Sequence, residues 1–226
     1  MQKLKRFIGV GLILGLCLSP INVFAKGIET INKADETTVD EPDDVDTPNY
    51  AGVPEDIKII LIEQEKFKEY SSQVTLTGTM KTNADALAKS CIEYYEEYGV
   101  LPSVCIGQAF IESHIGVDHS QSDYNWWGIA SCNIGYSTFN DGVIGYLSTI
   151  NNGYYPNAPF NTDPYSTISA IAPNYAASPT YQQDVTWAIN NYNLTAYDDY
   201  LFDSEEYKEY LESVENLWKE NHYART

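Results

Sequence analysis

From Pro54 onward, apolar residues recur every three or four positions, the spacing that places them on one face of an α-helix. Only residues 73–79 alternate in the manner of a strand. Together with the helix-start residues, the pattern predicts helices that begin near Ile57, Asn83, Pro102, Asn140, Ser178 and Ser204. We therefore predict an all-α domain over residues 54–226, with one hydrophobic core and a C-terminal helix over residues 204–222.

The first 25 residues have the pattern of a secretory signal peptide. Three basic residues precede an apolar run over residues 7–18, which is too short to span a bilayer, and residues 23–25 supply a cleavage site. Leu16 stands directly before Cys17, where a lipoprotein signal would have a small residue. We expect release rather than lipid anchoring, and hence a secreted or cell-wall-associated protein that has no membrane contact after cleavage.

The net charge limits the partners of the mature chain. Loss of Lys3, Lys5 and Arg6 with the signal changes the formal net charge from −19 to −22. Nucleic acid is excluded as a partner, because its phosphates require Lys and Arg. Residues 26–53 are acidic and have few aromatics, so we predict a disordered linker there. A polysaccharide bound by such a chain must be held by stacking and hydrogen bonds.

The cysteines and histidines do not suggest a cofactor. Signal cleavage leaves Cys91, Cys105 and Cys132, an odd number that allows at most one intrachain disulfide. Cys91 and Cys105 lie in predicted helices, where small buried thiols are common. His114 and His119 are five residues apart and lack the spacing of a helical metal pair, so no metal is expected.

Glu112 is the main candidate for chemistry. It lies near a predicted helix end among apolar neighbours, namely Ala109, Phe110, Ile111 and Ile115. Apolar surroundings disfavour the charged form of a carboxyl group, raise its pKa and let it hold a proton near neutral pH. A proton donor of this kind is what glycosidic bond cleavage requires.

Four sequence blocks around Glu112 resemble one family. The run PSVCIGQAFIES over residues 102–113 is similar to the PS-x-x-x-AQ-x-x-x-ES helix of the bacterial endo-β-N-acetylglucosaminidase family of peptidoglycan hydrolases. NWWGI over residues 125–129 resembles its N-N-L-F-G-I loop, YAASPTY over 175–181 its Y-A-T-D-P-x-Y element, and YNL over 192–194 its Y-x-L. The resemblance implies a lysozyme-like α-lobe with Glu112 as general acid.

The same blocks, together with aromatic residues outside them, supply further site residues. The resemblance implies Tyr175 as a second catalytic residue, which orients the sugar or stabilises positive charge at the anomeric carbon. Aromatic rings can form stacking platforms for sugars, although they also fill cores. The expected substrate-binding residues are Asn125, Trp126, Trp127, Tyr136, Tyr155 and Tyr181.

The chain also departs from the family pattern. His114, Ile115 and Gly116 replace the usual Gly-Trp-Gly, and residues 131–136 leave almost no room for the β-hairpin lobe that bears a second acidic residue. We therefore expect little or no β-lobe, and the second acid is not carried over. The candidates for a second acid are Asp118, Asp123 and Asp141, whereas Asp163 before Pro164 is typical of a turn. The substrate acetamido group is an alternative nucleophile.

These observations favour a secreted hydrolase of peptidoglycan glycan strands that cleaves β-1,4 bonds after N-acetylglucosamine. A muramidase or lytic transglycosylase on the same fold is the first alternative. An alternative of another class is a non-catalytic relative that binds wall glycan and has lost its second acid together with the β-lobe.

Overall fold

The computed structural model describes residues 52–118 and 123–223 of the chain. The predicted signal peptide and nearly all of the predicted linker lie outside these residues. The described residues fall within one compact unit, Tyr50–Thr226. Its helices are α2 (Glu55–Ser72), α3 (Gly78–Glu93), α4 (Tyr95–Tyr98), α5 (Pro102–Ser113), the 3-10 turn η1 (Ile129–Cys132), α6 (Phe139–Asn151), α7 (Pro164–Tyr175), α8 (Tyr181–Asn191), α9 (Thr195–Asp203) and α10 (Glu205–Tyr223).

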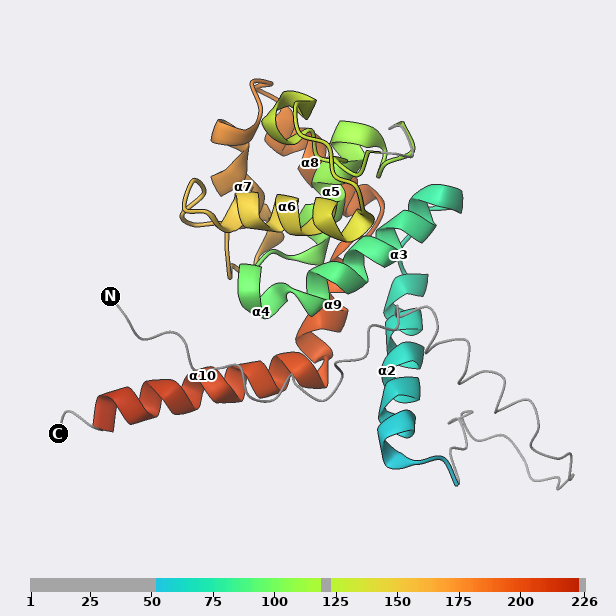
Figure 1. Cartoon of the computed structure of the whole chain (residues 1–226), viewed down its shortest axis with the longest axis vertical. Helices are drawn as coiled ribbons and strands as arrows, with labels where there is room; N and C mark the ends of the chain where they lie inside the picture. The colour runs from blue at the N-terminus through green and yellow to red at the C-terminus, as the bar shows by residue number, and fades with distance from the viewer. Residues whose placement is uncertain (1–51, 119–122, 224–226) are drawn as a thin grey trace, which may run out of the picture. The chain divides into compact units, whose positions relative to one another are not determined.

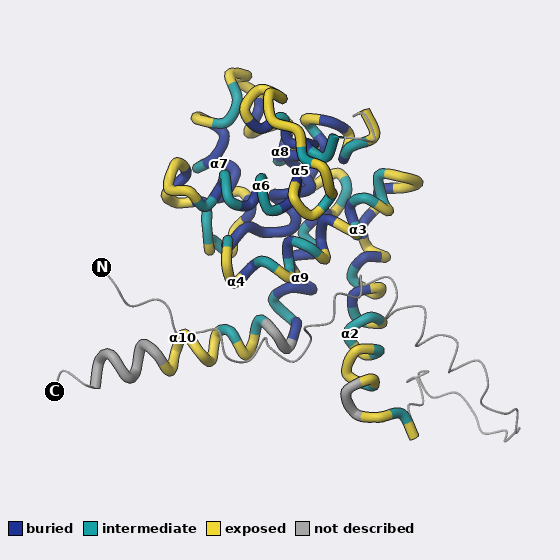
Figure 2. The backbone as a smooth tube through the Cα atoms, viewed as in Figure 1, coloured by how far each residue is buried: buried dark blue, intermediate teal, exposed yellow. Residues whose placement is uncertain are grey.

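The predicted all-α fold, with little or no β-lobe, is confirmed for this part of the chain, which contains no strand. Helix α5 forms the centre of the core and packs against α3, α7, α8 and α9 (Figure 1). Its residues from Pro102 to Phe110 are all buried, as the dark blue tube in Figure 2 shows. A helix that is apolar on every side is expected at the middle of a core.

Gly107 allows α8 to approach α5 closely. A Cβ at this position would lie 3.0 Å from Cγ1 of Ile189 and 3.2 Å from Cγ1 of Val185, both on α8. These distances are shorter than ordinary van der Waals contacts, so a larger side chain would force the α8 side chains to shift. Because Tyr181 is the first residue of α8, this close contact also brings Tyr181 next to the last turn of α5.

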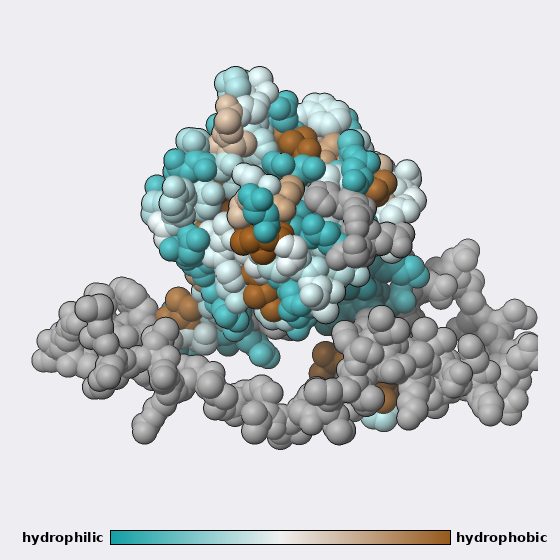
Figure 3. All heavy atoms as spheres, turned by 45° about the horizontal axis from the view of Figure 1, so that its top comes forward, coloured by the Kyte–Doolittle hydropathy of each residue, from teal (hydrophilic) through white to brown (hydrophobic). Residues whose placement is uncertain are grey.

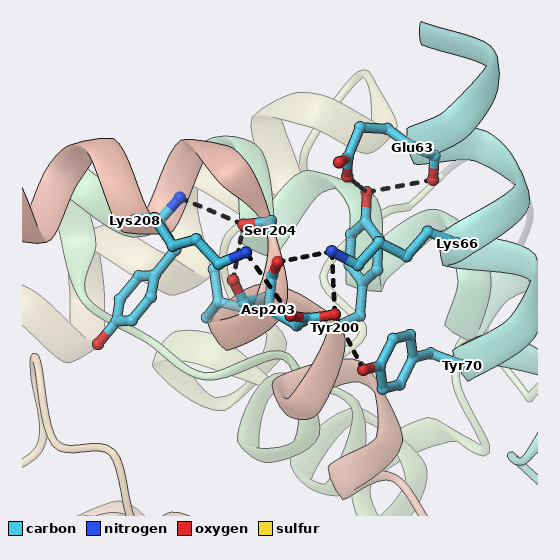
Figure 4. Close-up of polar contacts among 9 residues, drawn as sticks. Glu63, Lys66, Tyr70, Tyr200, Asp203, Ser204 and Lys208 are labelled. Atoms are coloured by element: carbon cyan, nitrogen blue, oxygen red, sulfur yellow. Dashed lines mark hydrogen bonds and ion pairs between the residues drawn. The ribbon is translucent and has the colours of Figure 1, made fainter. Parts of the chain in front are cut away.

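A polar network joins α2 to α9 and α10 (Figure 4). Lys66 on α2 forms an ion pair of 2.9 Å with Asp203 at the end of α9, and Tyr70 donates a hydrogen bond of 3.2 Å to the same carboxylate. Lys208 on α10 lies 3.7 Å from the other carboxylate oxygen. The hydrogen bond from Lys66 lowers the pKa of Asp203. This cluster attaches α2 and α10 to the end of α9.

The strand-like pattern of residues 73–79 does not form a strand. Val74 and Leu76 are buried, as the alternation predicts. The backbone N–H of Thr75, however, donates to the carbonyl oxygen of Tyr192 at the end of α8, at 3.1 Å. The segment therefore packs as an extended connection, and α3 begins at Gly78, within the predicted strand.

Two asparagines predicted as N-caps have other contacts. Helix α3 begins five residues before Asn83, whose Nδ2 donates to the carbonyl oxygen of Ile115 at 2.7 Å. Helix α6 is capped by Thr138, whose side chain accepts a hydrogen bond from the N–H of Asp141. Asn140 lies in the first turn of α6 and contacts the hydroxyl of Tyr94. Both errors place the start of a helix too late.

Other helix ends agree better with the sequence. Pro102 is at the start of α5, and α10 begins directly after Ser204, whose hydroxyl accepts from the N–H of Tyr207 at 3.2 Å. The helix predicted from Ser178 begins at Tyr181. Asp163, interpreted as part of a turn, is instead the N-cap of α7 and accepts hydrogen bonds from the N–H groups of Tyr165 and Ser166.

The surface of the described residues carries scattered apolar side chains. Figure 3 shows them on one face as separate hydrophobic patches among hydrophilic residues. The exposed isoleucines of α2 are Ile57, Ile59, Ile60 and Ile62. Within residues 52–118 and 123–223, no helix combines the length and the apolar character needed to cross a bilayer.

Candidate active site

Glu112 lies in the last turn of α5, next to a sharp change of backbone direction. The helix ends at Ser113, and His114, Ile115 and Gly116 all have positive φ angles. The hydrogen bond from Asn83 to the carbonyl oxygen of Ile115 holds this turn against α3. The backbone that carries Glu112 is therefore fixed by two helices.

Ser113 joins the helix end to the loop that resembles the family's N-N-L-F-G-I element. Its hydroxyl donates to the carbonyl oxygen of Trp126 at 2.8 Å and accepts from the N–H of Gly116 at 2.9 Å. Gly116 packs directly under the Trp126 indole, because a Cβ there would lie 2.2 Å from Cε2 of that ring. The Glu-Ser pair thus combines a candidate acid with the residue that positions the adjoining loop.

Asn125 shapes this loop from within. Its side-chain Nδ2 donates to the carbonyl oxygens of Ile129 and Ile134 at 2.9 and 2.8 Å, and its Oδ1 accepts from the N–H of Ile129 at 2.9 Å. The residue is fully buried. We therefore correct its expected role: Asn125 holds the loop in place and has no exposed surface for a sugar.

The loop brings Gly128 against the Glu112 carboxylate. Gly128 has a φ of 66°, and a Cβ at this position would lie 3.3 Å from Oε2 of Glu112 and 3.8 Å from Sγ of Cys132. A side chain at position 128 would be strained and would crowd the carboxylate. Gly128 was not among the residues predicted from the sequence, although the glycine of the matching family block was a usable signal.

A chain of hydrogen bonds runs from the core to Glu112. The hydroxyl of Tyr146 donates to Oε1 of Gln108 at 2.6 Å, and Nε2 of Gln108 donates to the hydroxyl of Tyr181 at 3.1 Å. The Tyr181 hydroxyl in turn makes a side-chain hydrogen bond with Glu112. Because Gln108 uses its N–H as donor, Tyr181 is left to donate its own proton to the Glu112 carboxylate.

Burial raises the pKa of Glu112, and the hydrogen bond from Tyr181 partly opposes this effect by stabilising the carboxylate. The residue is exposed as a whole, but its carboxylate end lies against Gly128 and Tyr181, which exclude water from one side. Burial also raises the pKa of Tyr181, so its hydroxyl remains a hydrogen-bond donor. The net effect is a raised pKa for a carboxyl group that is open to solvent on its other side.

Tyr175 lies at the end of α7, close to this group. Its ring stacks on that of Tyr181 with centroids 5.6 Å apart, and its hydroxyl donates to the carbonyl oxygen of Trp127 at 2.6 Å. Burial is the main cause of its raised pKa, with smaller contributions from the charges of Tyr181 and Glu112. Tyr175 therefore adjoins Glu112 and also holds the loop of Trp127 and Gly128.

Most of the expected sugar platforms are core residues. Trp127 is 1% exposed, stacks on Tyr146 at 4.6 Å and donates from Nε1 to the carbonyl oxygen of Cys105. Trp126 and Tyr155 are also buried, at 8% and 5% exposure. A sugar cannot stack on a ring whose faces are covered, so these three assignments are corrected to packing roles. Tyr136 is only partly buried and lies against Gly145.

The candidate second acids have local contacts of their own. Asp118 pairs with Nδ1 of His114, Asp123 accepts a hydrogen bond of 2.9 Å from the N–H of Asn125, and Asp141 is in the first turn of α6. Among the described residues, none of them contributes to the pKa shift of Glu112, which has only burial and Tyr181 as causes. A carboxylate close to Glu112 would raise its pKa further by charge repulsion.

The remaining ligand types give no metal site. Cys91 and Cys105 are buried with their thiols next to each other, Cys132 is exposed, and all three are free. No group of three or more His, Cys, Asp or Glu residues in the described part of the chain is placed to hold a metal ion.

Comparison with known proteins agrees with the sequence blocks. Residues 88–194 match the model of the glucosaminidase family, described as mannosyl-glycoprotein endo-β-N-acetylglucosaminidase. The expected family resemblance is confirmed over these residues. They include Glu112, the loop of Gly128, Tyr175 and Tyr181, whereas α2 and α10 lie outside the match.

One solved structure is also similar to the chain: the catalytic domain of the autolysin Auto from Listeria monocytogenes. The sequence identity is 20%, the alignment covers 59% of this chain and 96% of that chain, and the TM-score is 0.47. None of the curated proteins that were compared matches this chain.

Proposed function

We propose that this chain is a secreted peptidoglycan hydrolase that cleaves β-1,4 glycosidic bonds after N-acetylglucosamine, with Glu112 as the general acid. The observation that carries the proposal is the raised pKa of a solvent-accessible Glu112 inside the glucosaminidase-family match. The four wall-hydrolase sequence blocks and the predicted signal peptide support peptidoglycan as the substrate and the cell wall as the location.

In the proposed reaction, the Glu112 proton moves to the leaving glycosidic oxygen as the bond from that oxygen to the anomeric carbon breaks. Tyr181 holds the carboxyl group in place through its hydrogen bond. Tyr175 stacks on Tyr181 and, through the hydrogen bond from its hydroxyl to Trp127, holds the loop that carries Gly128.

The nucleophile is proposed to come from the substrate. None of Asp118, Asp123 and Asp141 contributes to the pKa shift of Glu112. The acetamido oxygen of the N-acetylglucosamine residue can instead bond to its own anomeric carbon, as in known exceptions to the two-carboxylate rule. Water then attacks that carbon, gives a proton to the Glu112 carboxylate and restores both the acetamido group and the acid.

The test is the substitution Glu112→Gln, in which the amide is nearly isosteric but cannot donate the required proton. We expect loss of clearance of purified peptidoglycan by a factor of about 10²–10⁴ with an unchanged circular dichroism spectrum. Glu96→Gln on α4 is the matched control, since it also removes one exposed carboxylate and should clear the wall normally. Normal clearance by Glu112→Gln would disprove the proposal.

Product analysis separates the bond specificities. Mass spectrometry of the digested wall should find N-acetylglucosamine at the new reducing ends. N-acetylmuramic acid there would indicate a muramidase, and its anhydro form a lytic transglycosylase.

The second candidate function is binding of wall glycan without cleavage. Among the described residues, no second carboxylate contributes to the pKa shift of Glu112, and this favours it because most glycosidases use two. Wild-type protein that binds purified wall but releases no reducing ends would identify this function.

A further inference from the structure

A groove of about 600 Å³ lies along the outer face of α8. Its lining residues are Gln182, Gln183, Thr186, Trp187, Asn190 and Asn191. They share one face because they recur at intervals of three and four residues. The opposite face of α8, with Val185 and Ile189, packs on α5, so the core of the domain leaves the groove open.

Trp187 gives the groove an aromatic wall. Its side chain is 52% exposed, which is unusual for so large an apolar ring. Phe110 and Tyr192 pack against it, with ring centroids 6.2 and 5.9 Å away, and the Tyr192 ring is nearly perpendicular at 79°. These contacts hold the indole in one orientation and leave part of it free for a flat partner.

Three of the four carboxamides that line the groove have no hydrogen-bond partner among the described residues. No hydrogen bond from residues 52–118 or 123–223 engages the side-chain amides of Gln182, Gln183 or Asn191. Asn190 accepts a hydrogen bond of 2.7 Å from the Tyr165 hydroxyl at its Oδ1, which leaves its amide N–H groups as donors. Each free carboxamide offers both donors and an acceptor.

The lining is also uncharged, although the chain carries a formal net charge of −19. Asp184 is on the same helix, but it does not line the groove and accepts a hydrogen bond of 2.9 Å from Thr180. A cationic ligand would find no carboxylate here, and an anionic ligand would find no Lys or Arg. The lining fits a neutral ligand that combines a flat apolar face with hydroxyl and amide groups.

We propose that this groove is a second glycan-binding site, which takes neutral N-acetylated amino-sugar rings separately from the Glu112 site. The C–H face of a sugar ring would stack on Trp187, and the carboxamides would pair with its hydroxyl and acetamido groups. The choice of an amino sugar over other neutral sugars rests on the proposed function, whereas the choice of a neutral glycan rests on the groove alone.

The position of the groove would help the protein to stay bound to a polymeric substrate. It begins at Gln182, directly after the residue that bonds Glu112, and follows a helix roughly 16 Å long. Two sites this close on one domain can engage the same insoluble substrate together, which slows dissociation without any new contact at the reacting bond.

Binding of a soluble chitotetraose probe to Glu112→Gln protein tests the proposal, because that chain should bind the probe without cleaving it. Isothermal titration is run on this chain and on the same chain with Trp187→Ala, Trp187→Phe, Gln183→Ala or Tyr154→Ala. Trp187→Ala should weaken the groove-bound component about tenfold, and Trp187→Phe should lose less. Tyr154 is a matched control, since it is exposed but outside the groove.

Gln183→Ala separates binding from folding, because Trp187 contacts Phe110 and Tyr192 and its loss can loosen α8. Position 183 is exposed and alanine favours a helix, so this variant should melt as its parent does yet bind the probe more weakly. Unchanged probe binding in both Trp187→Ala and Gln183→Ala would overturn the proposal. Equal binding of cellotetraose, which lacks acetamido groups, would overturn the proposed recognition of amino sugars.

The outcome does not depend on Glu112 being catalytic. If Trp187-dependent binding is found and wild-type protein does not cleave the wall, only the proposed hydrolysis fails. If the wall is cleaved and no binding depends on Trp187 or Gln183, only the second site fails.

Discussion

Asp198→Asn should change the way in which stability depends on pH. Asp198 lies on α9 and is 2% exposed, and its carboxylate accepts hydrogen bonds from the N–H and hydroxyl of Ser103 at 2.8 and 2.5 Å. It thereby satisfies one free N–H group at the start of α5, the helix that carries Glu112 in its last turn. Burial nevertheless raises the pKa of Asp198 from 3.8 to about 7.

The sign of the effect follows from the two pKa values. Below pH 3.8 the group is protonated in both the folded and the unfolded chain, and its contribution to stability is fully present. As the pH rises towards 7, the unfolded chain releases the proton while the folded chain retains it. At 1.36 kcal/mol per unit, the folded state loses roughly 4 kcal/mol of stability across this window.

The variant cannot titrate at this position, so this loss should be absent from it. The free energy of unfolding of Asp198→Asn, relative to the wild type, should rise by roughly 4 kcal/mol between pH 4 and pH 8. Urea denaturation followed by circular dichroism at each pH measures the difference. A difference that stays constant from pH 4 to pH 8 would refute the reasoning.

Asp203→Asn is a control of opposite sign. The hydrogen bond from Lys66 lowers the pKa of Asp203, so its contribution is present above pH 3.8 and is lost as the pH falls further. This variant should therefore be less stable than the wild type at neutral pH and equal to it in strong acid.

Three further predictions concern the Glu112 site. Tyr181→Phe removes the hydroxyl that lowers the pKa of Glu112, so the alkaline limb of the pH profile of kcat/KM should move to higher pH. The same variant leaves Nε2 of buried Gln108 without its hydrogen-bond partner, which should lower the free energy of unfolding measured in urea by about 1–3 kcal/mol. Tyr175→Phe removes the donor to the Trp127 carbonyl oxygen and should lower turnover more than glycan binding, with about 1 kcal/mol of stability lost; normal turnover per folded molecule would remove Tyr175 from the site. Peptidoglycan with de-N-acetylated glucosamine should resist cleavage and regain sensitivity on chemical re-acetylation, whereas equal cleavage of both forms would indicate a protein nucleophile.

The sequence predicted the elements whose signals are local and unambiguous. Pro102 fixes the start of α5, and the apolar run that follows fits a buried helix, so the helix and the place of Glu112 on it follow directly. The start of α7 was missed because Asp163 and Pro164 suit a turn as well as an N-cap followed by a first-turn proline. Only packing against the rest of the chain distinguishes the two.

The roles of the aromatic residues could not be predicted in the same way. A tryptophan serves equally as a core residue or a sugar platform, and the sequence does not show which face is covered. Trp127 is buried. Trp187 was not among the predicted site residues, and its ring is half-exposed. Gln108 could have been predicted from the sequence as a neighbour of Glu112, since it lies four residues earlier on the same face of α5.

The strong negative charge bears on how such a protein would stay on the cell wall. Wall polymers that carry anionic groups offer no attraction to a chain with a formal net charge of −19, and repulsion between exposed charges is only partly screened by salt. Contacts that do not involve charge must then supply the affinity. The residues that line the α8 groove are all neutral, and they combine a half-exposed indole with free carboxamides. A site of this composition would allow an acidic surface and a wall substrate to coexist, because its binding energy comes from stacking and neutral hydrogen bonds, which salt and net charge affect little.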